Sequence, residues 1–187
     1  MRDSVCALHQ SNDSCFVTFI IPSKGRDSIN RTIQSLFNQT HNIWNAVIIF
    51  DGEQELTSAA SGYLSDPRIR NYTIPKVGES NFAGILRNYG MSKDECAEWF
   101  AFVDDDDVLS PDYVARLLEE TRLNTLVQTV IFRMTGIYRA DQPILPPKED
   151  VMFVMDRVGI SFAIQKSVFQ SGFWFQSSSK EDSTILF

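Results

Sequence analysis

Residues 99–107 read WFAFVDDDD, so that five apolar residues run directly into four carboxylates. A short, continuously apolar run is typical of a strand that is buried on both faces, as in the middle of a parallel sheet. Four neighbouring acids repel one another and raise each other's pKa unless a cation lies among them. Because ligands of open α/β sheets bind beyond the carboxyl ends of the strands, the stretch predicts a metal site there. The alternative is a solvated acidic turn that leads into a helix.

Predicted strands and helices alternate on both sides of this stretch. Before it, strands are expected over 16–21, 44–50 and 68–74, and helices over 28–38 and, with a weaker pattern, 53–65. After it, a helix is expected over 110–122, strands over 125–134 and 159–164, and a helical turn over 166–170. Pro22 is expected to end the first strand. The repeated order of strand and helix is the signature of a parallel sheet with helices on its faces.

A helix expected over 81–91 has two distinct faces. At about 100° per residue, one arc holds apolar side chains that should pack on the sheet. These side chains are Phe82, Ile85, Leu86 and Tyr89. The opposite arc holds Asn81, Gly84, Arg87 and Asn88. The second arc either approaches a ligand or forms a solvated face.

Length and composition limit the number of domains and the kinds of partner. The chain has 187 residues, of which 43% are hydrophobic and 12% aromatic, enough for one domain with a substantial core. We expect residues 1–15 to form a tail and residues 16–187 a single domain, either truncated at its C-terminus or part of a longer protein. A net charge of −7 and an isoelectric point of about 4.8 argue against a nucleic-acid partner.

The cysteines and the hydropathy pattern bear on the cellular compartment. Cys6, Cys15 and Cys96 show no metal-binding or redox spacing and favour a reducing compartment. No apolar run approaches the length of a membrane span. We therefore expect a cytoplasmic protein, and leave open both its peripheral association with a membrane and its oligomeric state.

Seven stretches, taken in order, resemble the GT-A glycosyltransferases of the family 2 type, which use nucleotide-diphosphate sugars. The stretches are VTFIIPSKGR (17–26), INRTIQSLFNQT (29–40), VIIFDG (47–52), GILRNYG (84–90), FAFVDDDDVLSPDYV (100–114), GISFAIQKSVFQSGF (159–173) and KEDSTIL (180–186). No single stretch is specific, whereas the ordered set is. The resemblance implies an α/β, Rossmann-like GT-A fold in which a mostly parallel sheet lies between helices.

The resemblance also implies where a nucleotide-sugar donor binds. The implied donor-binding residues of the first loop are Pro22, Ser23, Lys24 and Arg26. Asp51 matches an acid that contacts the uracil and ribose, although an ordinary Asp–Gly turn is the alternative. Arg87 and Asn88 match an Arg-Asn pair near the diphosphate. An arginine suits an acidic protein that must bind an anion.

The acidic run resembles the Asp-x-Asp motif of the family. The resemblance implies that Asp106 binds the metal, that Asp104 lies on the ribose side as a second candidate ligand, and that Asp105 lies near the nucleotide. A run of four acids allows this register to shift by one residue. An all-oxygen site beside phosphates suits Mn²⁺ or Mg²⁺.

The last matching stretch and an aromatic segment before it are assigned to the acceptor side. The resemblance implies that Asp182 is the general base and that Glu181 supports it or binds the acceptor. The alternative is that both acids stabilise a helix N-terminus. Trp174 either forms a stacking platform for an acceptor sugar or packs in the core.

Taken together, the resemblance implies a metal-dependent, inverting, hexosyltransferase-like enzyme. It would move a sugar from a nucleotide-diphosphate sugar, expected to be a UDP-sugar, to a hydroxyl acceptor such as a glycan. One alternative is a sugar-phosphate nucleotidyltransferase, although the loop after the first strand holds only Gly25 with Lys24 and Arg26, where those enzymes usually have a Gly-rich basic loop. The other is a non-catalytic nucleotide-sugar-binding module.

Overall fold

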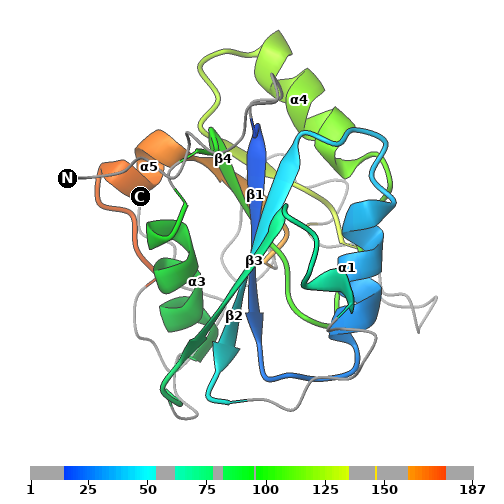
Figure 1. Cartoon of the computed structure of the whole chain (residues 1–187). Helices are drawn as coiled ribbons and strands as arrows, with labels where there is room; N and C mark the ends of the chain where they lie inside the picture. Colours follow the sequence, from blue (N-terminus) through cyan, green and yellow to red (C-terminus); the bar gives the residue numbers. More distant parts are fainter. Residues whose placement is uncertain are drawn as a thin grey trace.

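A six-stranded sheet in the order β3–β2–β1–β4–β6–β5 forms the centre of the computed structural model (Figure 1). The structure describes residues 15–53, 62–77, 82–94, 96–134, 146 and 160–175. The strands are β1 (Val17–Ser23), β2 (Trp44–Asp51), β3 (Ile69–Ile74), β4 (Trp99–Phe102), β5 (Thr129–Ile131) and β6 (Phe162–Gln165). The helices are α1 (Ile29–Phe37), α3 (Phe82–Ser92), α4 (Tyr113–Leu123) and α5 (Lys166–Gln170).

The sheet is mostly parallel, as predicted. Parallel pairing joins β1 to β2, β1 to β4 and β2 to β3, whereas β6 runs antiparallel to both β4 and β5. The strands predicted over 16–21, 44–50 and 68–74 are confirmed. The later strands are shorter than predicted, because β6 begins only at Phe162 of the predicted 159–164 and β5 covers only part of 125–134. The helix predicted over 110–122 begins only at Tyr113. Most of the weak helix predicted over 53–65 lies outside the described residues.

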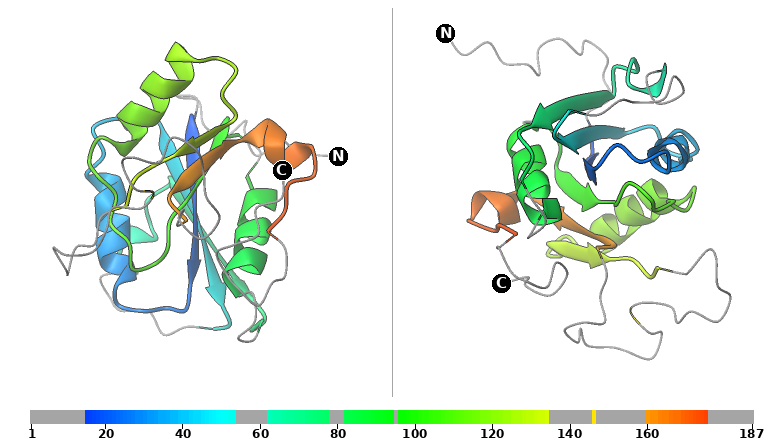
Figure 2. Two further views of the ribbon diagram at one scale, coloured as in Figure 1. Left: turned by 180° about the vertical axis from the view of Figure 1, so that it is seen from behind. Right: turned by 90° about the horizontal axis from the view of Figure 1, so that it is seen from below.

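Helices cover both faces of the sheet, so the predicted three-layer arrangement is confirmed (Figure 2). Phe19 and Ile21 of β1 point to the face that packs against α1 and α4, where one core cluster lies. Ile20 points to the opposite face and joins Leu86 of α3 and Phe169 of α5 in a second cluster. This alternation along a strand of fully buried residues explains why β1 has no polar face.

Pro22 lies inside β1 and does not end it, which corrects the prediction from sequence. The carbonyls of Phe16 and Ile20 accept hydrogen bonds from Trp99 and Val103, so the even-numbered residues of β1 turn their backbone polar groups toward β4. Pro22 belongs to this set but lies beyond Ile20, the last residue paired with β4. Its missing N–H therefore costs no hydrogen bond of the ladder, and pairing with β2 continues to Ser23.

The face of α3 that meets the sheet differs from the predicted arc. Ile85 is 38% exposed, whereas Leu86 and Arg87 are almost completely buried. The helix packs most closely at Gly90, which shares a helical face with both of these residues. A Cβ atom at Gly90 would lie 2.6 Å from Ile49 Cδ1 and 2.7 Å from Ile20 Cγ2. The close approach of α3 at Gly90 thus turns Arg87 toward the sheet.

We predict that Gly90→Ala destabilises the protein because the added methyl group forces α3 away from β1 and β2. Overpacking of this kind costs roughly 1–3 kcal/mol, and the helix propensity of alanine offsets up to about 1 kcal/mol of it. Urea denaturation followed by circular dichroism measures the change. Gly62→Ala is the matched control, because nothing lies within 4 Å of a Cβ atom there. Equal effects of the two substitutions would contradict the packing argument.

Asp94 anchors the end of α3 to the amino edge of the sheet. It is 3% exposed, and its carboxylate accepts hydrogen bonds from Thr18 Oγ1 at 2.5 Å and Arg70 Nη2 at 2.6 Å. The backbone N–H groups of Cys96 and Ala97 also donate to it. Burial alone would raise the pKa of Asp94, but the Thr18 and backbone hydrogen bonds and the Arg70 charge together lower it.

We predict that Asp94→Asn lowers the free energy of unfolding at pH 7 by about 1–3 kcal/mol, because Arg70 loses its buried charged partner. A carboxyl group with a lowered folded-state pKa stabilises the protein above its unfolded pKa of about 4. That stability disappears as the pH falls through the folded-state value. Chemical denaturation between pH 3 and pH 7 should therefore show the two proteins converging in acid. Asp112→Asn, at an exposed pair with Arg116, is the control and should change little.

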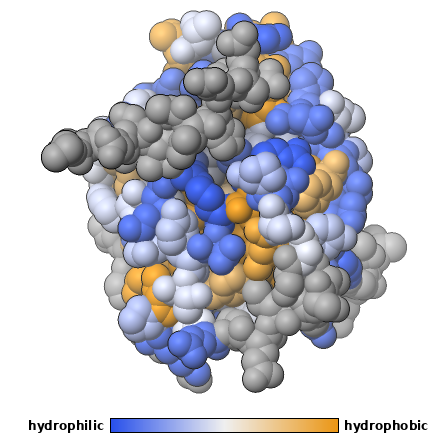
Figure 3. Space-filling view, in the orientation of Figure 1, coloured by the Kyte–Doolittle hydropathy of each residue, from blue (hydrophilic) through white to orange (hydrophobic). Residues whose placement is uncertain are grey.

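The surface and the cysteines add little to the cellular assignment. Hydrophilic residues predominate on the face shown in Figure 3, with smaller apolar areas between them. Within the described residues, none of the helices is long and apolar enough to cross a membrane. Cys15 has a free thiol, whereas Cys96 is disulfide-bonded. The cysteines therefore do not support the reducing compartment predicted from their spacing.

Candidate active site

Three parallel strands bring the predicted site residues to one edge of the sheet. The carboxyl ends of β1, β2 and β4 lead into the loop of residues 23–28, into Asp51, and into the acidic run of residues 104–107. Ser23 pairs with Phe50, the residue before Asp51, and Ile20 pairs with Phe102, two residues before Asp104. The register therefore places all three segments at the same edge, as the sequence predicted.

Asp105 joins the loop after β1 to the loop after β4. Its carboxylate is buried and accepts hydrogen bonds from Ser23 Oγ at 2.8 Å and from the Lys24 backbone N–H at 3.2 Å. Ser23 Oγ in turn accepts a bond from the N–H of Gly25, whose φ of 73° is left-handed and suits glycine. Burial raises the pKa of Asp105, opposed by these hydrogen bonds and by Arg26. Asp105 was predicted as a nucleotide contact, and its contacts here make it a link between two loops.

Asp104 and Asp106 are more accessible than Asp105, which lies between them in the run. Their side chains are 38% and 52% exposed, whereas that of Asp105 is 6% exposed. Burial and the neighbouring charges of Asp104 and Asp106 raise the pKa of Asp107 to about 6. The alternation favours Asp104 and Asp106 as the pair that can meet a ligand, which is the register implied by the family resemblance.

Arg87 lies behind the acidic run. Its side chain is 2% exposed, and its Nη2 donates to Asp104 Oδ1 at 2.6 Å. The guanidinium carbon lies 5.4 Å from the centre of the Phe175 ring, and Nε has no partner among the described residues. Arg87 was predicted to lie near the diphosphate, on an arc that faces either a ligand or solvent. In this structure its buried side chain supports the partly exposed carboxylate of Asp104, and its role toward a donor stays a prediction. A buried arginine of this kind offsets the repulsion between the acids.

Asn88, the neighbour of Arg87, holds the segment after α5. Its side-chain amide donates to the Phe175 carbonyl and accepts from the Phe175 N–H, both at 2.9 Å. This pair of bonds fixes the backbone of Phe175, and with it the ring that packs beside Arg87. These hydrogen bonds give Asn88 a structural task at the segment after α5, and its predicted contact with the donor stays a prediction.

Asp51 is buried at the end of β2, where its Oδ1 accepts a hydrogen bond from the Val77 N–H at 2.7 Å. Gly52 follows with a φ of 80°, and its N–H donates to the Ile74 carbonyl. The Asp–Gly turn that the sequence left open is therefore present. The carboxylate also holds the loop after β3 against the candidate site.

The acceptor-side predictions are only partly covered by the structure. Trp174 is 51% exposed, so the alternative of core packing is wrong. Its ring lies 5.2 Å from that of Phe169, which leaves an exposed aromatic surface after α5. Glu181 and Asp182, the predicted catalytic pair, lie outside the described residues. Their roles stay predictions.

Thr32 and Ser35 of α1, together with Gln39 just after the C-cap Asn38, form a polar brace on α1 that holds the chain following the acids. Thr32 Oγ1 donates to the Asp107 carbonyl at 2.7 Å, and Ser35 Oγ accepts from the Leu109 N–H at 3.1 Å. The Gln39 amide donates to the Ser110 carbonyl and accepts from the Val114 N–H. All three side chains are at most 6% exposed. Sequence reasoning missed them, although their spacing of three and four residues marks one helical stripe.

We predict that Thr32→Val destabilises the protein by about 1–2 kcal/mol, because the isosteric change removes the buried hydroxyl that donates to the Asp107 carbonyl. Thermal and urea unfolding measure the loss. Thr73→Val, at an exposed position of β3, is the control with the same chemistry and should stay within about 0.5 kcal/mol of wild type. If the hydrogen bond from Thr32 contributes nothing to stability, Thr32→Val and Thr73→Val will have the same free energy of unfolding.

The carboxylates at this edge of the sheet are candidate ligands of a divalent cation. Within the described ranges, no three His, Cys, Asp or Glu side chains gather into a group that could hold a metal. Mg²⁺ and related ions beside nucleotides are often bound by only one or two carboxylates, with phosphate oxygens and water completing the shell. Asp104 and Asp106 supply that number of hard oxygen ligands, so the residues fit a site that the donor completes.

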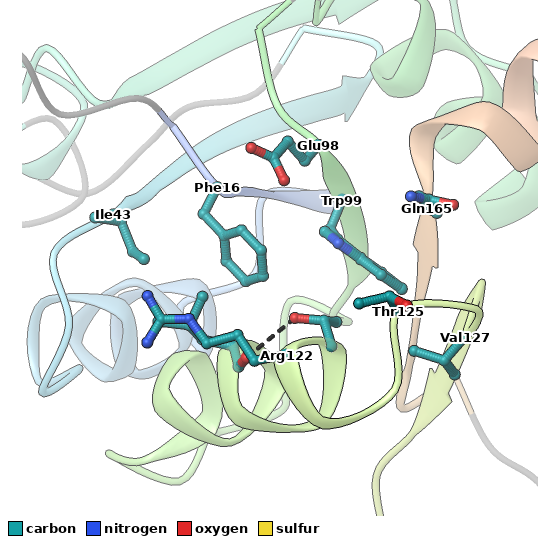
Figure 4. A pocket seen from close by; sticks show the side chains of 10 residues that line it. Phe16, Ile43, Glu98, Trp99, Arg122, Thr125, Val127 and Gln165 are labelled. Carbon is teal, nitrogen blue, oxygen red and sulfur yellow. Dashed lines mark hydrogen bonds between the residues drawn. The ribbon is translucent and has the colours of Figure 1, made fainter.

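A pocket of about 540 Å³ lies elsewhere in the molecule (Figure 4). It is lined by Phe16, Ile43, Trp99, Leu118, Arg122 and Val127, among others. Phe16 precedes β1 and Trp99 begins β4, so this pocket lies at the amino ends of strands whose carboxyl ends carry the acids. None of the predicted site residues lines it, and chemistry at the acidic edge does not depend on it.

The layered sheet and its acidic carboxyl edge define an α/β protein of the GT-A type. A family model described as "Glycosyl transferase family 2" matches residues 18–170, and the chain belongs to this family. It is 29% identical over 104 residues to the succinoglycan biosynthesis protein ExoO of Rhizobium meliloti (strain 1021), an alignment that covers 55% of this chain and 29% of ExoO.

Solved structures of S. aureus TarS share the fold. A crystal structure of TarS 1–349 has a TM-score of 0.71 at 16% identity and covers 86% of this chain and 50% of that one. The same protein in complex with UDP-GlcNAc has a TM-score of 0.72 at 14% identity and covers 89% and 51%. This chain thus spans about half of the length of these TarS chains and 29% of the length of ExoO. The GT-A fold predicted from the resemblance is confirmed.

Proposed function

We propose that this chain is the donor-binding part of a metal-dependent, inverting glycosyltransferase that uses a nucleotide-diphosphate sugar. The observation that carries the proposal is the pair of partly exposed carboxylates, Asp104 and Asp106, held at the carboxyl edge of the sheet by Arg87 and Arg26. An acidic protein repels an anionic nucleotide, and a divalent cation bound by these carboxylates would supply the positive charge that attracts it. TarS, which shares the fold, has been solved with UDP-GlcNAc and with UDP, and this supports a UDP-sugar as the donor.

The proposed donor site is assembled from the loops at this edge. Asp51 and the loop of residues 22–26 receive the nucleotide, and Asp104 and Asp106 face the diphosphate and its cation. A bound Mn²⁺ or Mg²⁺ would supply Lewis-acid stabilisation of the negative charge on the departing diphosphate. Asp105 and the brace on α1 hold the two loops in place.

The chemical step proposed is a single displacement with inversion at the anomeric carbon. An acceptor hydroxyl, such as that of a glycan, transfers its proton to Asp182 while its oxygen attacks the anomeric carbon. The bond between that carbon and the diphosphate oxygen breaks, and the nucleoside diphosphate leaves. Glu181 supports the base, and the exposed ring of Trp174 stacks on the acceptor sugar.

The test separates donor binding from catalysis with two substitutions. We predict that UDP with Mn²⁺ raises the melting temperature of the wild type and that Asp106→Asn abolishes this shift, because the cation loses a carboxylate ligand. Asp182→Asn should keep the shift but lower the rate of sugar transfer by roughly 10²–10⁴-fold. Asp112→Asn, at the N-cap of α4 and outside the proposed donor site, is the control for loss of one charge.

Two results would contradict the proposal. If Asp106→Asn and Asp182→Asn both transfer sugar at near wild-type rates, the assigned site is wrong. If UDP and Mn²⁺ bind but no transfer occurs across a panel of UDP-sugars and glycan acceptors with the full-length protein, the chain is a binding module instead. Release of diphosphate from a nucleoside triphosphate and a sugar phosphate would indicate a nucleotidyltransferase.

A further inference from the structure

Arg26 lies between two carboxylates of the acidic run. It belongs to the loop between β1 and α1, and its Nη1 is 3.4 Å from Asp105 Oδ1 and 3.2 Å from Asp106 Oδ2. Asp105 is itself held by Ser23 and by the Lys24 backbone. The inner carboxylate is thus a fixed anchor, and it places the guanidinium beside the outer carboxylate. The contact with Asp105 therefore distinguishes the Arg26–Asp106 pair from an ordinary ion pair on the protein surface.

The pairs formed by Arg26 and Arg87 differ in their access to solvent. The Arg87 side chain is 2% exposed and is therefore held in place, although its partner Asp104 is 38% exposed. The side chains of Arg26 and Asp106 are 53% and 52% exposed. Ion pairs between exposed groups are weak and are readily exchanged for other partners. Asp104 therefore has a permanent partner, whereas Asp106 has one that can leave.

We propose that Arg26 is an exchangeable counter-ion of Asp106, which neutralises this carboxylate in the empty site and moves to the donor diphosphate when a divalent cation takes its place. This inference rests on the proposed function, because it takes Asp106 as a metal ligand. In this proposal Arg26 competes with the cation for Asp106 and then binds the diphosphate of the donor.

The exchange follows from charge and geometry. A divalent cation on Asp106 would lie within a few ångströms of the guanidinium, and two positive charges at that distance repel each other. The half-exposed arginine can swing away on its long side chain without unburying apolar surface. A diphosphate bound to the same cation offers the planar guanidinium a stronger, bidentate partner than the carboxylate it leaves.

The test measures cation and nucleotide affinity separately, with Arg26→Gln and the charge-conserving Arg26→Lys. Arg26→Gln should bind Mn²⁺ alone about threefold to tenfold more tightly than wild type, because the competitor is gone. At saturating Mn²⁺ the same variant should bind UDP about fivefold or more weakly, because the diphosphate has lost a donor. Mn²⁺ affinity is followed by electron paramagnetic resonance of the free ion, and UDP affinity by calorimetry.

Two further variants separate the effect of the Arg26 charge from the effect of net charge. Arg26→Lys should stay within about twofold of wild type for Mn²⁺, since the positive charge is kept. Arg116→Gln removes another exposed arginine, from its pair with Asp112 at the start of α4, and should change neither affinity. A general effect of net charge would instead appear in Arg116→Gln as well, and would overturn the proposal.

The opposite directions of the two effects make the proposal falsifiable. Mn²⁺ affinity that is unchanged or weaker in Arg26→Gln overturns it, and so does UDP affinity equal to that of the wild type. Either result leaves the proposed function standing, provided that wild type binds Mn²⁺ and Asp106→Asn does not. If wild type binds no Mn²⁺ even with UDP, the metal site of the proposed function fails, and this inference fails with it.

Discussion

The repulsion among four adjacent carboxylates is the constraint on which this edge of the molecule depends. The structure meets it by giving each acid a different environment. Asp104 pairs with a buried arginine, Asp105 turns inward onto the β1 loop, and Asp106 faces solvent beside Arg26. Asp107 keeps a raised pKa of about 6 and is fixed through its backbone carbonyl by Thr32. A run of identical residues thus becomes four positions with different chemistry.

The same arrangement explains how the fold serves the site. The parallel strands β1 and β4 end side by side, and Asp105 converts that adjacency into a direct link between their loops. Asp94 fixes α3 at the opposite edge of the sheet, and the contact at Gly90 sets how closely the helix lies on β1 and β2. Together these contacts determine where Arg87 reaches the acids. The position of one guanidinium therefore depends on packing along the whole length of α3.

Periodicity and composition predict most of the fold, and fail where tertiary contacts decide. Continuous apolar runs predict buried strands such as β2. The alternation of these strands with helices predicts the parallel sheet and the helical layers on its faces. The orientation of α3 does not follow, because Ile85 and Arg87 exchange burial through a contact that only Gly90 permits. From the sequence, Pro22 is expected to end a strand. The sequence does not show that the pairing of β1 with β4 ends before Pro22, so that its missing N–H has no partner to lose. The acids of the site are visible in the sequence, but which of them turns inward depends on Ser23, and Thr32, Ser35 and Gln39 look like ordinary helix residues.

The brace on α1 makes the chain between β4 and α4 a segment of defined length. Thr32, Ser35 and Gln39 bind the backbone at Asp107, Leu109, Ser110 and Val114, so they fix the path of the chain from the acids to the first turn of α4. One residue inserted between Asp107 and Val114 would shift every later partner out of register with its side chain. Variation in loop length, by which α/β proteins commonly acquire new specificities, is therefore blocked directly after the acids. Evolution at this edge has to proceed by exchanging side chains.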